Sequence, residues 1–188
     1  MRLLILLMSL LAALACASST AGPEVLLSAS ITDPAGDGSS ADIVSVDVEV
    51  IGTDMFLTVR FTPEGFHSDS VVVQFNFDTD ENAGTGYTTA NAGHVGFGID
   101  CLVEVGKITT TSRGARVKRW DTGVFVTAMN GFLQDIPNGF KAQIPADACE
   151  DDGPALLKVD SFRQVSATAY TTRRDWAPDP GEPAAQIR

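Results

Sequence analysis

The stretch that decides the fold runs from Val71 to Gly86 and reads VVVQFNFDTDENAGTG. Its first half alternates β-branched or aromatic residues with residues that include Gln and Asn, which is the period-2 pattern of a strand with one buried face. Its second half places Asp78, Asp80 and Asn82 at alternate positions and ends in a glycine-rich turn. Because three hard oxygen ligands can converge in such a loop, the stretch predicts a core strand that leads directly into a metal site.

Calcium is the metal that this loop favours. It takes many oxygen ligands in flexible geometry, and a bound ion offsets the repulsion between neighbouring carboxylates. The loop begins like an EF-hand, but Ala83 and Thr89 stand where that motif needs Gly and Glu, and no helical pattern flanks it. The alternative is a polar turn whose Asp and Asn side chains bond to their own backbone and bind no ion.

A second acidic loop follows the first expected strand, in a segment rich in Pro, Gly and Ser. We expect its aspartates, together with Asp100, to contribute to the same metal site or to a neighbouring one, and the ion to have a structural role. The sequence leaves open whether there is one calcium site or two. The candidate ligands are Asp33, Asp37, Asp42, Asp78, Asp80, Asn82 and Asp100.

Length and charge limit the classes of function. The chain has 188 residues, which is typical of one domain with a real core, and its hydrophobic content of 44% argues against disorder. Acidic residues outnumber basic ones 24 to 13, for a net charge of −11. A field of that sign repels phosphate backbones and anionic lipids, so we expect no nucleic-acid partner.

The N-terminal segment has the pattern of a signal peptide, which we assign to residues 1–15. A short basic start precedes the apolar run Leu3 to Leu14, and Ala13-Leu14-Ala15 is a small-x-small cleavage signature. Leu14-Ala15-Cys16 resembles a bacterial lipobox, in which the cysteine is lipidated; cleavage as late as residue 21 would discard it instead. We expect an exported protein, secreted, periplasmic or at the cell surface, with a tether at 16–23 and one domain at 24–188.

The chain has three cysteines. Both fates of Cys16 leave Cys101 and Cys149 to pair, because unpaired thiols are uncommon in exported proteins. On the chain-entropy account such a disulfide stabilises the fold by roughly 4 kcal/mol. The alternative is two buried free thiols.

Short alternating segments separated by Gly, Pro, Asn and Asp predict an all-β protein. We expect an antiparallel two-sheet β-sandwich, jelly-roll-like, because one face of each sheet must be buried against another. We also expect a turn at Asn130-Gly131. The expected strands are Val25–Ile31, Ile43–Ile51, Met55–Phe61, Val71–Phe77, Phe97–Val105, Arg116–Trp120, Val124–Asn130, Phe140–Ile144 and a segment within Leu156–Thr171.

Three groups of residues carry a resemblance to a known family. They are Asp33-x-x-x-Asp37 with Asp42-Ile43; Phe77-Asp78-Thr79-Asp80-x-Asn82-x-x-Thr85-Gly86 followed by Gly98-Ile99-Asp100; and Asp175-Trp176-Ala177-Pro178-Asp179. Together they resemble the exported β-sandwich domains grouped with family 9 carbohydrate-binding modules and DOMON-like domains. The likeness spans most of the mature chain as scattered loop motifs. It implies a two-sheet sandwich with structural calcium, and sugar or haem binding on one exposed face. It does not imply a particular ligand.

Sugar binding requires aromatic rings that stack on a pyranose face, and the candidates are Trp120, Trp176 and Tyr87. Haem would need axial ligands from His67, His94, Met55 or Met129. We expect the two histidines to lie in solvated loops and the two methionines in the core instead. No catalytic motif appears in the sequence, so we expect that the protein is not an enzyme.

We therefore expect an exported, calcium-stabilised, non-catalytic binding or accessory module, with polysaccharide as its first candidate partner. The alternative is a structural cell-surface or assembly component that binds another protein and no small molecule. Membrane contact is expected only through a lipid at Cys16. An exposed aromatic cluster would favour the first reading.

Overall fold

The computed structural model describes residues 24–37, 41–64, 66–88, 97–109, 111–149, 155–163, 175–180 and 182–188. The predicted signal peptide at 1–15, the tether at 16–23 and Cys16 lie outside these residues, as does His94. Within the described ranges the chain has no helix of the length and apolar character needed to cross a membrane.

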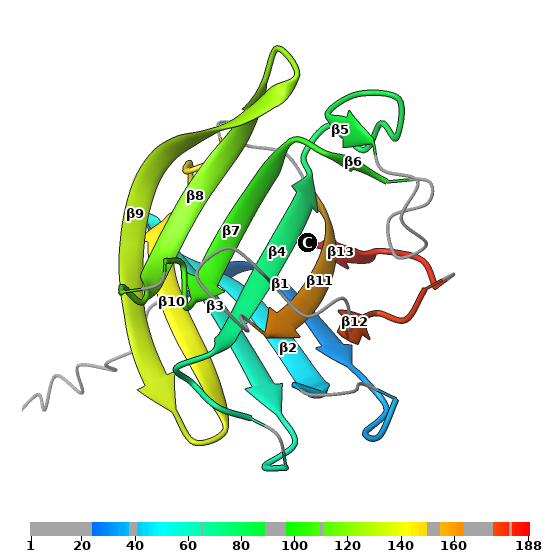
Figure 1. Ribbon diagram of the computed structural model, residues 1–188. Coiled ribbons are helices and arrows are strands. Elements are labelled where there is room, and N and C mark those ends of the chain that lie inside the picture. The colour runs from blue at the N-terminus through cyan, green and yellow to red at the C-terminus, as the bar shows by residue number, and fades with distance from the viewer. Residues whose placement is uncertain are drawn as a thin grey trace, which may run out of the picture.

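The described residues form strands joined by turns and loops (Figure 1). The strands are β1 (Val25–Thr32), β2 (Ile43–Ile51), β3 (Asp54–Phe61), β4 (Val71–Asp78), β5 (Tyr87–Thr88), β6 (Gly98–Ile99), β7 (Cys101–Gly106), β8 (Gly114–Asp121), β9 (Val124–Ile136), β10 (Gly139–Pro145), β11 (Ala155–Arg163), β12 (Asp175–Ala177) and β13 (Ala185–Ile187).

The predicted all-β, antiparallel sandwich is confirmed, and its two layers are parts of one folded sheet. The strand order is β1-β2-β3-β10-β9-β8-β7-β4-β11-β12, with β13 also paired to β11 and with β5 and β6 forming a separate two-stranded sheet. The long strand β9 pairs with β8 through its first part and with β10 through its last part, so it joins the two layers along one side (Figure 1).

The opposite side is closed by the end of the chain. Ser28 in β1 donates its N–H to the Arg188 carbonyl oxygen at 2.7 Å, and the Arg188 N–H returns to the Ser28 carbonyl oxygen at 3.1 Å. Because β13 is paired to β11, these two bonds connect the first strand to the second layer. The sheet is therefore nearly closed, which leaves little unprotected edge.

The core lies between the two layers. In β4, Val71, Val73, Phe75 and Phe77 are all buried, as predicted, but Val72 and Asn76 are buried too, so this strand is covered on both faces and not on one. The four predicted side chains face inward-pointing residues of the other layer, which include Val46, Val48, Leu57 and Val59. Burying a side chain of this kind contributes about 1.5–3 kcal/mol, so the interior of the sandwich dominates its stability.

The predicted turn at Asn130-Gly131 is wrong. β9 continues through these residues to Ile136, and the hairpin turn to β10 is made by Pro137 and Asn138. Asn138 adopts a φ of 52°, which suits the second position of this two-residue turn, so the chain reverses at Pro137-Asn138 and Gly139 already belongs to β10. At Gly131 the reason for glycine is close packing, because a Cβ there would lie 2.7 Å from the Gln143 carbonyl oxygen.

The predicted disulfide between Cys101 and Cys149 is present, with the two Cα atoms 5.6 Å apart and a sequence separation of 48. It ties the start of β7 to the loop that follows β10. This loop therefore has a covalent anchor in the other layer of the sandwich.

Candidate metal centres and an aromatic cluster

The first acidic group forms where β4 ends. Carboxylate oxygens of Asp78, Asp80 and Asp100 lie within 4.8 Å of one another. Asp100 arrives there because the predicted strand Phe97–Val105 is interrupted: β6 pairs with β5, β7 pairs with β4, and Asp100 stands between them. Its N–H donates to the Phe77 carbonyl oxygen at 2.9 Å, which fixes it beside the acidic loop.

Backbone N–H groups converge on the same carboxylates. Asp78 accepts the Asn82 N–H at 3.0 Å and the Gly98 N–H at 3.2 Å, and Asp100 accepts the Thr79 N–H at 3.0 Å. These bonds hold the loop against β6 and fix the carboxylates of Asp78 and Asp100 in place. We call Asp78, Asp80 and Asp100 the first acidic centre.

Asn82 and Asp80 both make turn bonds to the backbone two residues further on. The side-chain oxygen of Asn82 accepts the Gly84 N–H at 3.0 Å, and the Asn82 N–H donates to Asp80 at 2.9 Å. This is the polar-turn role that the sequence left open. Both side chains therefore shape the loop, and the three carboxylates supply its negative charge.

Burial changes the pKa of two carboxyl groups in the first acidic centre. Asp78 is almost fully buried and Asp100 is half-buried. Loss of water raises the pKa of both carboxyl groups, although the N–H groups that they accept lower it in part. The charge of Asp100 raises the pKa of Asp78 further. A cation would relieve both costs, since it favours the ionised form of each group.

The second acidic centre consists of Asp33, Asp37 and Asp175, whose carboxylate oxygens also lie within 4.8 Å of one another. Asp42 belongs to the same loop and accepts the Gly36 N–H at 2.9 Å. Asp175 was not among the predicted ligands, although its motif Asp175-Trp176 carried part of the family resemblance. Strand pairing brings it there, because β12 packs along β11 and beside β2.

Asp33 is the least satisfied group of this centre. It is only 5% exposed, and its Oδ2 has no hydrogen-bond partner. Burial, and then the charge of Asp175, raise the pKa of Asp33 to about 8. Burial likewise raises the pKa of Asp175 to about 7, even though its carboxylate accepts the Ile43 N–H. A buried, unpaired oxygen among carboxylates is what a bound cation would satisfy.

The two centres lie at opposite ends of the sandwich. Asp78 pairs with Leu156 at one end of β11, whereas Asp175 pairs with Ser161 near the other end. The seven predicted ligands are therefore divided between two places, and Asp100 belongs with Asp78 and Asp80.

Three rings form a cluster beside the first acidic centre. The Trp120 centroid lies 5.0 Å from that of Tyr87 and 5.0 Å from that of Phe125, and Tyr87 and Phe125 are 5.6 Å apart. The backbone N–H of Trp120 donates to the Asp100 carbonyl oxygen at 2.7 Å, which places the cluster beside the centre. Phe125 was not among the predicted rings, which were Trp120, Trp176 and Tyr87.

The remaining candidates lie elsewhere. Trp176 is half-buried on β12, next to the second acidic centre. His67 is exposed in the loop after β3, Met55 is in the core, and Met129 packs against the core. These three residues occupy the solvated and core positions expected of them.

The chain matches no protein-family model and no curated protein sequence.

Proposed function

We propose that this chain is an exported, calcium-stabilised, non-catalytic module that binds carbohydrate through Tyr87, Trp120 and Phe125. The observation that carries the proposal is this aromatic cluster next to the first acidic centre. Tyr87 is 40% exposed, while Trp120 and Phe125 are half-buried and contact its ring. An exposed ring on a rigid aromatic base provides the apolar surface on which a sugar ring stacks.

Calcium at the first acidic centre would fix the geometry of this surface. Tyr87 follows Gly86 directly, at the end of the loop that Asp78 and Asp80 organise. An ion that holds this loop against Asp100 also holds Tyr87 near Trp120. We therefore expect carbohydrate affinity to fall when calcium is removed.

Calcium at the second acidic centre would act on stability alone. It would join the loop between β1 and β2 to β12, and it would neutralise the buried charge of Asp33 and Asp175. An ion that binds only the folded state stabilises it by mass action, by about 3 kcal/mol at a concentration roughly 100 times the dissociation constant.

Affinity electrophoresis against a panel of soluble polysaccharides tests the binding proposal. Retention in at least one gel should be lost in Trp120→Ala and Tyr87→Ala. Trp176→Ala is the matched control, because it also removes a tryptophan but lies on β12. If the wild-type protein is retained by none of the polysaccharides, or if Trp176→Ala weakens retention as much as Trp120→Ala, the proposed site is wrong.

Export is the second part of the proposal, and it rests on the signal-peptide pattern of residues 1–15. Mass spectrometry of the mature protein distinguishes the two fates of Cys16. A lipidated cysteine at the new N-terminus would anchor the module to a membrane, whereas cleavage beyond it would release the module. An N-terminus that still begins at Met1 in exporting cells would contradict export.

A structural role in a protein assembly is the second candidate. It is favoured by three exposed apolar side chains on β9: Val124 at 57%, Val126 at 48% and Phe132 at 65%. Exposed apolar side chains on one strand are a feature of protein-binding surfaces. Concentration-dependent assembly in sedimentation that Phe132→Ser abolishes, together with no polysaccharide retention, would favour this candidate.

A further inference from the structure

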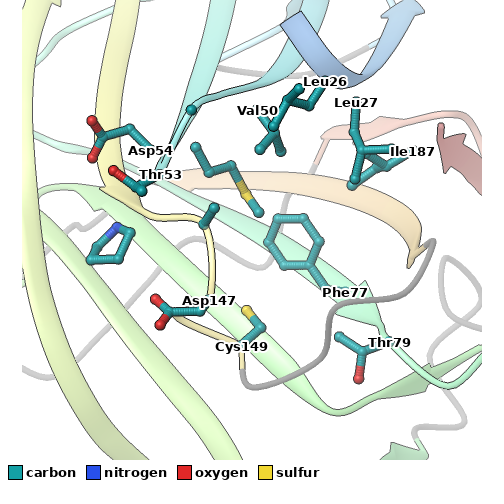
Figure 2. Close-up of a pocket in the computed structure, with 14 residues that line it drawn as sticks. Leu26, Leu27, Val50, Thr53, Asp54, Phe77, Thr79, Asp147, Cys149 and Ile187 are labelled. Atoms are coloured by element: carbon teal, nitrogen blue, oxygen red, sulfur yellow. The ribbon is translucent and has the colours of Figure 1, made fainter.

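A cavity of about 530 Å3 opens at the end of the sandwich where β2 turns into β3 (Figure 2). None of the predicted sites includes it. Its walls come from β1, from the turn between β2 and β3, from the end of β4, from the loop after β10 and from β13. The lining residues are Leu26, Leu27, Val50, Gly52, Thr53, Asp54, Met55, Phe77, Thr79, Pro145, Ala146, Asp147, Cys149 and Ile187.

An irregularity in β1 creates part of this wall. Successive residues of a regular strand point to opposite faces, but the register with β2 shifts between Val25 and Leu27. As a result, the neighbours Leu26 and Leu27 both line the cavity. Leu26 is 57% exposed, so the cavity reaches solvent at this point.

The opposite wall is held in place by several bonds. The Ala146 N–H donates to the Thr53 carbonyl oxygen at 2.9 Å, and Arg119 Nε donates to the Ala148 carbonyl oxygen at 2.7 Å. Cys149 is bound covalently to Cys101. A wall fixed in this way loses little freedom when a ligand enters, which favours binding.

The lining is divided by polarity. In Figure 2, Leu26, Leu27, Val50 and Ile187 gather at one side with Phe77 below them, while Thr53, Asp54 and Asp147 lie toward the other side, their carboxylates directed away from the apolar side chains. Among the residues that the structure describes, no Lys, Arg or His lines the cavity. An apolar wall opposite two carboxyl groups complements a molecule with an apolar body and a positive charge.

We propose that this cavity binds a small amphipathic cation, with its apolar body against Leu27, Val50 and Phe77 and its ammonium group toward Asp54 and Asp147. The volume suits a small molecule and is too small for a folded partner. The net charge of −11 raises the local concentration of cations and repels anions of the same shape. The proposal is independent of carbohydrate binding, because the aromatic cluster contributes no residue to this cavity.

Three probes of equal chain length test which headgroup charge the cavity prefers. They are n-octylammonium, 1-octanol and octanoate, each added below its aggregation limit at constant calcium. Binding is followed by the amide resonances of Leu26, Thr53, Asp54 and Asp147 in NMR spectra of the oxidised protein. We expect n-octylammonium to bind about fivefold more tightly than 1-octanol, as for a partly exposed ion pair, and octanoate to bind most weakly.

Two double variants test whether Asp54 and Asp147 cause the preference for n-octylammonium. The double variant Asp54→Asn with Asp147→Asn keeps the shape of the rim and should reduce n-octylammonium to the affinity of 1-octanol. The double variant Glu64→Gln with Asp69→Asn is the control: it changes the net charge equally, in the exposed loop between β3 and β4. This control should still bind n-octylammonium more tightly than 1-octanol.

A third variant, Ala146→Trp, should fill the cavity and remove the binding of all three probes. If it fails to fold, the double variant at Asp54 and Asp147 and its control still test whether the cavity prefers a cation. The proposal is overturned if no probe moves the cavity resonances, if octanoate binds as tightly as n-octylammonium, or if the rim variant and its control lose the preference equally.

Discussion

The carboxylate of Asp33, at the end of the first strand, lies within 4.8 Å of that of Asp175, near the end of the chain. Both residues are only 5% exposed, and Asp33 Oδ2 has no hydrogen-bond partner. Two buried carboxylates at this distance destabilise each other when both are ionised. The fold nevertheless brings them together, so the energetic cost of their charges depends on pH, and a cation bound there, as we propose, would reduce that cost.

The stability of the metal-free protein should fall as the pH rises. The pKa of Asp33 is raised from 3.8 in the unfolded chain to about 8, so the folded state binds this proton more tightly than the unfolded state does. Stability is therefore greatest below about pH 4 for this group and is lost progressively up to about pH 8. Thermal unfolding in EGTA across this range should show the decline, and calcium should raise Tm more near pH 8 than near pH 5.

Asp33→Asn is the matched variant for this prediction. It keeps the shape of the side chain and removes the charge, so in EGTA near pH 8 its Tm should exceed that of the wild type. Calcium should raise its Tm by less. A calcium response near pH 8 that equals the wild-type response would remove Asp33 from the metal centre.

Asp80→Ala tests the first acidic centre. Asp80 is exposed, so its removal should cost little stability in EGTA. In calcium the Tm should fall, because the ion loses a ligand and stabilises by mass action less effectively. Differential scanning calorimetry in calcium and in EGTA measures the effect. Identical curves for Asp80→Ala and wild type under both conditions would show that this loop binds no calcium.

Gly86→Ala should destabilise the acidic loop by about 1–3 kcal/mol. Gly86 has a φ of 64°, and a Cβ there would lie 2.8 Å from the Ile99 carbonyl carbon. Gly52 is the control, because its φ is 60° and a Cβ would meet nothing within 4 Å. Urea unfolding should show a larger loss for Gly86→Ala than for Gly52→Ala; equal losses would mean that backbone conformation alone matters.

Replacing Cys101 and Cys149 together by Ser should lower the free energy of unfolding by about 4 kcal/mol on the chain-entropy account. The bond closes a loop of 48 residues and joins the two layers of the sandwich. Urea unfolding of the double variant and of the oxidised wild type measures the difference. No difference would mean that the native contacts of the loop after β10 hold it without the bond.

Local pattern was sufficient for most of the strands. The alternation in Val71–Phe77 reappears as β4 with Val71, Val73, Phe75 and Phe77 buried, and the cysteine count was enough to pair Cys101 with Cys149. Such predictions succeed because side chains alternate between the two faces of a strand, and this alternation can be read from neighbouring residues in the sequence. The turn between β9 and β10 shows the limit: Asn130-Gly131 has the local pattern of a hairpin turn but lies inside β9, and the chain turns at Pro137-Asn138 instead.

The sequence by itself determined an all-β fold and the acidic loop that follows β4. The tertiary structure alone decided which of the acids meet: Asp100 joins Asp78 and Asp80, and Asp175 joins Asp33 and Asp37. It also placed Phe125 against Trp120 and formed the cavity behind Leu26 and Leu27. The physical reason is that strand periodicity depends on neighbours along the chain, whereas a site depends on pairing between strands that are distant in sequence.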